Sequence, residues 1–118
     1  MNEAKGSQIL QQAKKLTEEE AIKELFNWRS PLNTRPKQVA PEGNWTTWLI
    51  LAGRGFGKTR TGAEWVRERV ESGLSKRIAL IGKTPADCRD VMIEGESGLI
   101  SISPPWNKPK YEPSKRRV

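Results

Sequence analysis

The side chains with the clearest chemical meaning lie in one glycine-rich run, Ala52-Gly53-Arg54-Gly55-Phe56-Gly57-Lys58-Thr59. Glycines let a backbone wrap closely around phosphate oxygens, with its N–H groups pointing inward. A lysine after the last glycine supplies a cation for the β- and γ-phosphates, and the next hydroxyl supplies a ligand for Mg²⁺. The residue types and their spacing therefore predict a nucleoside triphosphate site, with Lys58 on the phosphates and Thr59 on the metal.

The context of this run matters as much as its composition. Its first position holds Ala52, so it matches only the relaxed form of the phosphate-loop pattern G-x-x-x-x-G-K-[ST]. A bland turn that binds nothing is the alternative, but such a turn has no use for Lys and Thr directly after the last glycine. The predicted nucleotide contacts are Gly53, Arg54, Gly55, Phe56, Gly57, Lys58, Thr59 and Arg60.

The elements that must position this loop are a strand before it and a helix after it. Apolar runs at 48–52 and 77–82 read as two strands, the second resembling a parallel strand buried on both faces. Strand, helix and strand at this spacing form a right-handed βαβ unit. The predicted fold class is α/β: a partial P-loop NTPase fold, incomplete, with a parallel sheet and flanking helices.

The helix after the loop is predicted over residues 58–72, with Gly73 just past its end. An apolar stripe faces the sheet, and the charged side chains are mostly assigned to the solvent face. The stripe comprises Ala63, Val66, Val70 and Leu74; the charged set comprises Glu64, Arg67, Glu68, Arg69 and Glu71. A further helix begins after Thr84, a plausible N-cap before Pro85, and runs to about residue 93.

The chain divides into two predicted regions. Residues 1–30 form an N-terminal tail and helical segment, broken near Thr17, where Thr17 and Glu20 make a capping box. Residues 31–118 form the N-terminal part of the ATPase domain. Prolines keep 29–47 irregular, and prolines again interrupt the stretch from Ser103, although Lys115–Val118 resembles the start of a strand.

Composition narrows the possible partners. A net charge of +7 favours an anionic partner such as nucleic acid or nucleotide, with a solubilising surface as the alternative. One cysteine and no histidine exclude a disulfide within the chain and a Cys/His metal site. Because no apolar stretch approaches membrane-spanning length, we expect a soluble protein of the bacterial host cytoplasm with no membrane partner.

With these segments in view, the chain resembles the N-terminal part of a bacteriophage terminase large subunit, the ATPase that packages viral DNA. The most telling stretch is Trp48–Arg67, in which Arg54 stands inside the phosphate loop. Arg35–Gln38 and Val91–Leu99 also resemble the family, as do the Pro-Pro-Trp and Tyr-Glu-Pro-Ser pieces near the end.

The resemblance implies roles for two further residues. Arg54 matches the family's loop arginine, which contacts the γ-phosphate and couples hydrolysis to movement, so Arg54 and Lys58 are the predicted catalytic residues. Gln38 matches an upstream glutamine that reads the adenine edge of ATP, because a carboxamide donates and accepts at once. A surface ion pair for Arg54 and a plain polar surface for Gln38 are the alternatives.

The family's remaining parts are missing from this sequence. No apolar run ends in the acidic pair of a Walker B strand, since Glu94 and Glu96 lie in a glycine-containing loop, and the nuclease domain is absent. We therefore expect a piece that binds ATP and Mg²⁺ without turnover. The resemblance implies that the full-length protein works with double-stranded DNA, a portal protein and a small terminase subunit, and that it can form a homo-oligomeric ring. The alternatives are another P-loop ATPase such as a helicase-like motor, or a degenerate prophage fragment without activity.

Overall fold

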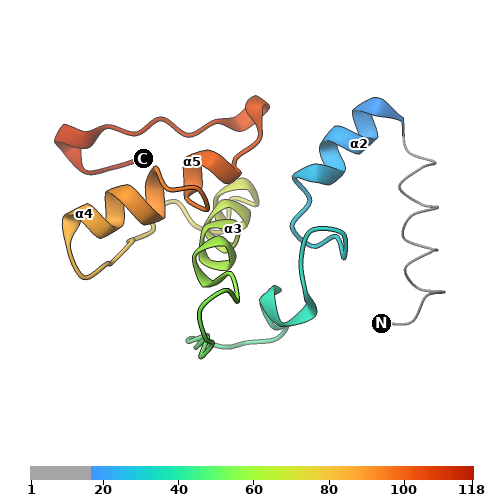
Figure 1. The fold of residues 1–118 in the computed structure, drawn as a ribbon, viewed down its shortest axis with the longest axis horizontal. Helices are drawn as coiled ribbons and strands as arrows, with labels where there is room; N and C mark the ends of the chain where they lie inside the picture. The colour runs from blue at the N-terminus through green and yellow to red at the C-terminus, as the bar shows by residue number, and fades with distance from the viewer. Residues whose placement is uncertain (1–16) are drawn as a thin grey trace. The chain divides into compact units, whose positions relative to one another are not determined.

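Figure 1 shows the computed structural model of the chain, which describes residues 17–118. The predicted tail over 1–6 and the predicted helix before Thr17 lie outside the described residues. The chain splits into two compact units, one ending at Val39 and the other spanning Ala40–Val118. Each unit is described by itself.

The first unit contains one α-helix, α2 (Glu18–Leu25), in its described part. The Thr17 hydroxyl accepts a hydrogen bond from the Glu20 N–H at 3.2 Å, and the Glu20 carboxylate accepts one from the Thr17 N–H at 3.3 Å. This reciprocal pair satisfies two N–H groups that a helix start leaves without partners, and it confirms the predicted capping box. A short 3₁₀-helix, η1 (Pro36–Gln38), follows in the proline-containing segment.

In the second unit the phosphate loop leads directly into α3 (Lys58–Glu71), which Figure 1 shows in green. The helix ends at Glu71 with Ser72 as its C-cap, and Gly73 follows with a φ of +74°, donating its N–H to the Val70 carbonyl at 3.0 Å. A left-handed residue just past a helix end is a position that favours glycine. The predicted helix and its glycine end are therefore confirmed.

The rest of the second unit is built from short helices. Helix α4 (Pro85–Asp87) continues into the π-helix η2 (Cys88–Ile93), and α5 (Leu99–Ile102) follows. The Thr84 hydroxyl accepts the Asp87 N–H at 3.1 Å, which confirms the predicted cap. Two 3₁₀-helices, η3 (Pro105–Asn107) and η4 (Pro113–Lys115), lie in the proline-rich end of the described chain.

The core of this unit lies between α3 and α5. Ala63 packs with Leu99 and Ile102, and Val66 and Leu80 cover the cluster as half-buried neighbours. The predicted apolar stripe of α3 is therefore right only in its first half, because Val70 and Leu74 are exposed. The end of α3 is contacted by a polar group, since Asn107 Nδ2 donates to Glu71 Oε1 at 3.2 Å.

The predicted parallel sheet is wrong. Within residues 17–118 the structure contains no β-strand, and the single β-bridge is the antiparallel one that joins Glu112 to Arg117. Segments 48–52 and 77–82 have no regular secondary structure. The α/β fold class with its βαβ unit is thus replaced by a helical arrangement.

The burial pattern explains why the strand prediction failed. In 48–52 the side chains alternate: Trp48 and Ile50 are half-buried, whereas Leu49 and Leu51 are 72% and 85% exposed. That alternation is typical of strand-like chain with one covered face. A strand, however, exists only through a ladder of hydrogen bonds to a neighbour. The described residues provide no such neighbour, and local sequence pattern cannot report its absence.

The predicted strand start at Lys115–Val118 is also wrong. Lys115 closes η4, and Arg116 follows with a φ of +49°, a left-handed conformation that breaks an extended run. Arg117 then exchanges backbone hydrogen bonds with Glu112 across this tight turn. The prolines that precede the segment favour such a turn over a strand.

The exposed apolar side chains of 48–52 give a first prediction. We expect Leu51→Lys to leave the melting temperature nearly unchanged and to reduce self-association, because an exposed side chain contributes little to the core while apolar patches promote association. Thermal unfolding followed by circular dichroism and light scattering measure the two effects.

The matched control is Ile102→Lys, which introduces a charge where the side chain is 2% exposed. This variant should lose its cooperative transition, because a buried unpaired charge is expensive. If both variants lose the transition equally, Leu51 is not on an open surface.

Candidate functional site

The phosphate loop turns into α3 through two glycines in left-handed conformations. Gly55 has a φ of +80°, and Gly57, the N-cap of the helix, has a φ of +89°. Residues with a Cβ adopt these angles only with strain, so the turn requires glycine at both positions. The glycines at these two positions in the sequence therefore allow the backbone to make the turn into α3.

The Lys58 ammonium is held within the loop itself. Its Nζ donates to the Ala52 carbonyl oxygen at 2.6 Å, which joins the first and last parts of the loop. The lysine side chain is otherwise exposed. The ammonium group is thus placed at the loop and bound by a single carbonyl, a partner that a more strongly accepting anion can replace.

The other predicted loop residues differ in their exposure. Arg54 is exposed, whereas Phe56 and Thr59 are half-buried. Sequence reasoning missed Thr61, which is fully buried and whose hydroxyl donates to the Gly57 carbonyl at 2.8 Å. The Thr61 N–H donates to the same carbonyl at 2.9 Å. These two hydrogen bonds from Thr61 to the Gly57 carbonyl fix the loop onto the first turn of α3. A threonine four residues after the glycine is the sequence pattern that indicates this contact.

A buried carboxylate follows one turn later on α3. Glu64 is 2% exposed, and its Oε1 accepts from Arg60 Nε at 2.9 Å while its Oε2 accepts from Arg67 Nη1 at 3.4 Å. The sequence assigned Glu64 and Arg67 to the solvent face, and this assignment is wrong. Arginines four residues before and three residues after a glutamate are the pattern that indicates this arrangement.

Burial also changes the acidity of this group. Desolvation raises the pKa of the Glu64 carboxyl, although the charges of Arg67 and Arg60 oppose that shift. Arg67 in turn pairs with Glu71 at 3.2 Å and donates to the Ile102 carbonyl at 3.3 Å. The network therefore connects Arg60, next to the loop, with α5.

Gln38 belongs to the first unit, where it is buried. Its Oε1 accepts from the Arg35 N–H at 3.1 Å and from Arg35 Nε at 3.3 Å. The carboxamide oxygen is therefore engaged with its own loop. Gln38 lies in the first unit and the loop residues lie in the second, so the role of Gln38 at the adenine stays a prediction.

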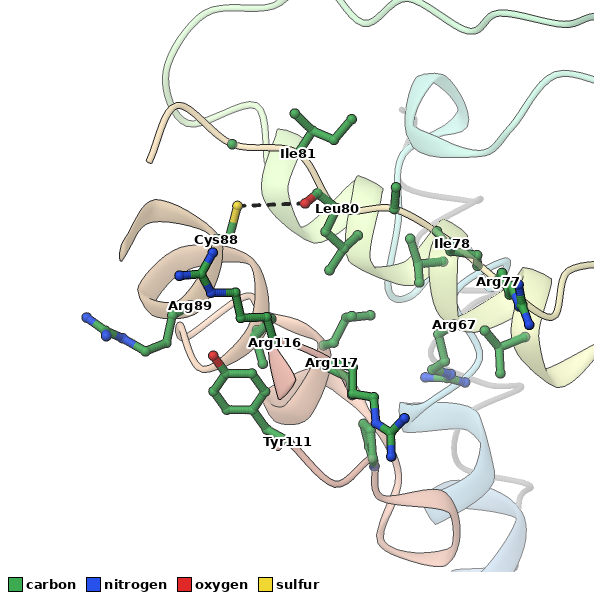
Figure 2. Close-up of a pocket in the computed structure, with 18 of the residues that line it drawn as sticks. Arg67, Arg77, Ile78, Leu80, Ile81, Cys88, Arg89, Tyr111, Arg116 and Arg117 are labelled. Carbon is green, nitrogen blue, oxygen red and sulfur yellow. Dashed lines mark hydrogen bonds between the residues drawn. The ribbon is translucent and has the colours of Figure 1, made fainter. Parts of the chain in front are cut away.

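A cavity of about 1020 Å³ opens elsewhere in the second unit and is shown in Figure 2. Its walls come from α3 beyond Val66, the segment 76–85, helix η2 and the chain after Ser103. None of the predicted phosphate-loop contacts, Gly53–Arg60, lines it. The phosphate loop and this cavity are separate features of the unit.

With the loop geometry established, comparison with known proteins identifies the family. Residues 49–118 match the family described as "Terminase large subunit, T4likevirus-type, N-terminal". The chain belongs to this family. The matched residues include the glycine-rich loop Ala52–Thr59 and leave out Gln38. It confirms the resemblance drawn from the sequence, and it assigns the chain to the phage DNA-packaging terminases.

The other comparisons add nothing to this assignment. No curated protein and no solved structure matches the chain. Across residues 17–118, no helix combines the length and apolarity needed to span a bilayer.

The buried carboxylate gives a second prediction, on pH dependence. Because the pKa of Glu64 is raised in the folded chain, the folded state holds the proton more tightly than the unfolded state. The free energy of unfolding of the wild-type chain should therefore fall, relative to Glu64→Gln, as pH rises from the ordinary carboxyl pKa to the raised one. Denaturant unfolding at a series of pH values measures this difference.

Asn44→Gln is the matched control, because Asn44 is exposed in the same unit and neither amide side chain titrates. The difference in the free energy of unfolding between this variant and the wild-type chain should not vary over that pH interval. Parallel pH curves for wild type and Glu64→Gln would contradict the burial of this charge.

Proposed function

We propose that this chain is the ATP-binding part of a DNA-packaging motor, with ATP held by the loop Ala52–Thr59. The observation that carries the proposal is the loop itself: left-handed glycines at 55 and 57 lead into the N-terminus of a 14-residue helix, and Lys58 closes the loop. Membership in the terminase large subunit family supports the same role.

Backbone groups supply the first part of the proposed phosphate site. The Thr61 N–H donates to the Gly57 carbonyl at 2.9 Å. Lys58 and Thr59 open the helix, and the first N–H groups of a helix have no carbonyl within the helix to bond. Such a helix start, with its positive dipole end, suits an anion. Lys58 then exchanges the Ala52 carbonyl for phosphate oxygens.

The magnesium proposal rests on Thr59. Its hydroxyl directly follows Lys58 at the helix start, and an oxygen ligand suits a hard cation. Within the described residues, no cluster of three or more acidic, cysteine or histidine side chains offers a cage for a metal. A Mg²⁺ ion here would be held by Thr59 together with phosphate oxygens and water, a mode that Mg²⁺ commonly adopts. The bound ion would neutralise charge on the phosphates.

Arg54 is the proposed partner of the terminal phosphate. It lies exposed on the turn between Gly53 and Gly55. A planar guanidinium at this place can pair with two phosphate oxygens and offset charge on a transferring phosphoryl group. In the full-length protein, this contact would link nucleotide state to movement of double-stranded DNA, with a portal protein, a small subunit and a homo-oligomeric ring as further partners.

We also propose that this chain does not turn ATP over. Catalysis needs a carboxylate that can activate water, and the carboxylate nearest the loop along α3, Glu64, is occupied by two arginines. Glu94 and Glu96 are exposed in the loop before α5. The motor activity therefore depends on an acidic group that these residues do not supply.

Nucleotide binding is tested with Lys58→Ala. Removing a charge-assisted contact costs about 1.5–3 kcal/mol, so the dissociation constant for ATP·Mg²⁺ should rise about tenfold to a hundredfold. Isothermal titration calorimetry on the full chain measures it. Lys110→Ala, which removes an exposed lysine of the same unit, should bind as wild type does. Equal affinities for the two variants would refute the proposed site.

Turnover is tested separately by counting released phosphate. We expect none above background from wild type at saturating ATP·Mg²⁺. Phosphate release that disappears in Lys58→Ala would show that the chain is a complete ATPase, and it would overturn the proposal of binding without turnover.

A further inference from the structure

The cavity of Figure 2 has a wall made of open backbone. Within the described residues, the N–H and C=O groups of Arg77–Gly82 make no hydrogen bond to other backbone groups, and Leu80 O accepts only from the Cys88 thiol, at 3.7 Å. The side chains alternate, with Ile78 and Leu80 half-buried and Ile81 84% exposed. A stretch of this kind is a template for pairing with another extended chain.

Part of the cavity lining is apolar. Val66 and Val70 of α3 line it, together with Ile78, Ile93 and Leu99. Leu99 is buried in the core cluster, and Val66 and Leu80 pack against that cluster. Because these side chains continue the core to the cavity surface, they offer places for alternate apolar side chains of an incoming segment.

The rim of the cavity is strongly basic. Among the side chains that line it, the only carboxylate is Glu71, which is already paired with Arg67. Besides Arg67, six cationic side chains line the cavity: Lys76, Arg77, Lys83, Arg89, Arg116 and Arg117. Arg89 pairs with Asp90, and Arg117 pairs with Glu112. Lys76, Arg77, Lys83 and Arg116 form no ion pair or side-chain hydrogen bond with any described residue. This excess of positive charge calls for an acidic partner.

We propose that this cavity binds an extended acidic peptide segment, which pairs its backbone with Arg77–Gly82. Its alternate apolar side chains enter the cavity, and its carboxylates meet Arg77 and Arg116 at the rim. A nucleic acid would use the cations alone, since phosphates and sugars match neither the apolar part of the lining nor a row of open amides. The volume of about 1020 Å³ accommodates several side chains.

The test is binding of synthetic peptides to the full chain, followed by fluorescence anisotropy of a labelled peptide. The probe is the acetylated heptapeptide Glu-Val-Glu-Ile-Glu-Val-Glu, which alternates acidic and apolar side chains. Its matched control replaces every Glu by Lys. We expect the acidic peptide to bind at least tenfold more tightly than the basic one.

Backbone pairing is tested on the peptide, so that folding of the protein is not disturbed. Two variants of the acidic peptide carry N-methyl groups on alternate amides. In the first variant the methyl groups block one edge of the extended peptide, and in the second they block the opposite edge. One of them should lose at least tenfold in affinity, and the other should retain it, because only one edge of the peptide faces Arg77–Gly82. Equal affinities of both methylated peptides and the unmethylated one would overturn the pairing.

The rim charges are tested with the double variant Arg77→Glu, Arg116→Glu. It should lose the acidic peptide and gain the basic one, and an unfolded chain cannot show such a gain. Lys110→Glu, an exposed lysine that does not line the cavity, should behave as wild type. Unchanged preference in the double variant, or displacement of the peptide by a short oligonucleotide that binds more tightly, would overturn the proposal. These peptide measurements do not depend on whether the chain binds nucleotide, so this proposal and the proposed nucleotide site can fail separately.

Discussion

The charge of Glu64 is the constraint on which the arrangement of the second unit depends. A carboxylate that is almost fully removed from water must be compensated, because breaking a buried ion pair costs about 3–5 kcal/mol. Arg60 and Arg67 provide that compensation from the same helix, one turn to either side. Since Arg67 also binds the Ile102 carbonyl, the rotation of α3 about its own axis is tied to the position of α5.

This arrangement gives α3 two different tasks along its length. Its first turn supports the phosphate loop, because Gly57 caps the helix and Thr61 binds the Gly57 carbonyl. Its middle forms the core with α5 through Ala63. Its last turns carry exposed apolar side chains and line the cavity through Val70. One helix thus connects the proposed nucleotide site to the proposed peptide site through a continuous, ion-paired scaffold.

The family match identifies the chain as part of a terminase large subunit, whereas the structure shows how its described residues fold. The family match begins at residue 49 and includes the glycine-rich loop Ala52–Thr59. The described residues nevertheless form a helical unit without a sheet. The glycine-rich loop is held in its local shape by the glycine angles, the Lys58 contact to Ala52 and the Thr61 contact to Gly57, all of which lie within ten residues of chain.

The sequence by itself determined the features that depend on near neighbours. The capping box at Thr17, the cap at Thr84 and both ends of α3 rest on hydrogen bonds between residues three or four apart, and residue types report such contacts directly. Only the tertiary structure decided that Glu64 is buried and that, within residues 17–118, segments 48–52 and 77–82 form no strand. Burial depends on which distant segment covers a side chain, and a strand depends on a neighbour to complete its ladder. A local sequence pattern reports neither condition. The glycine-rich loop and its helix were therefore predictable, whereas the absence of strands and the buried ion pairs of Glu64 were not.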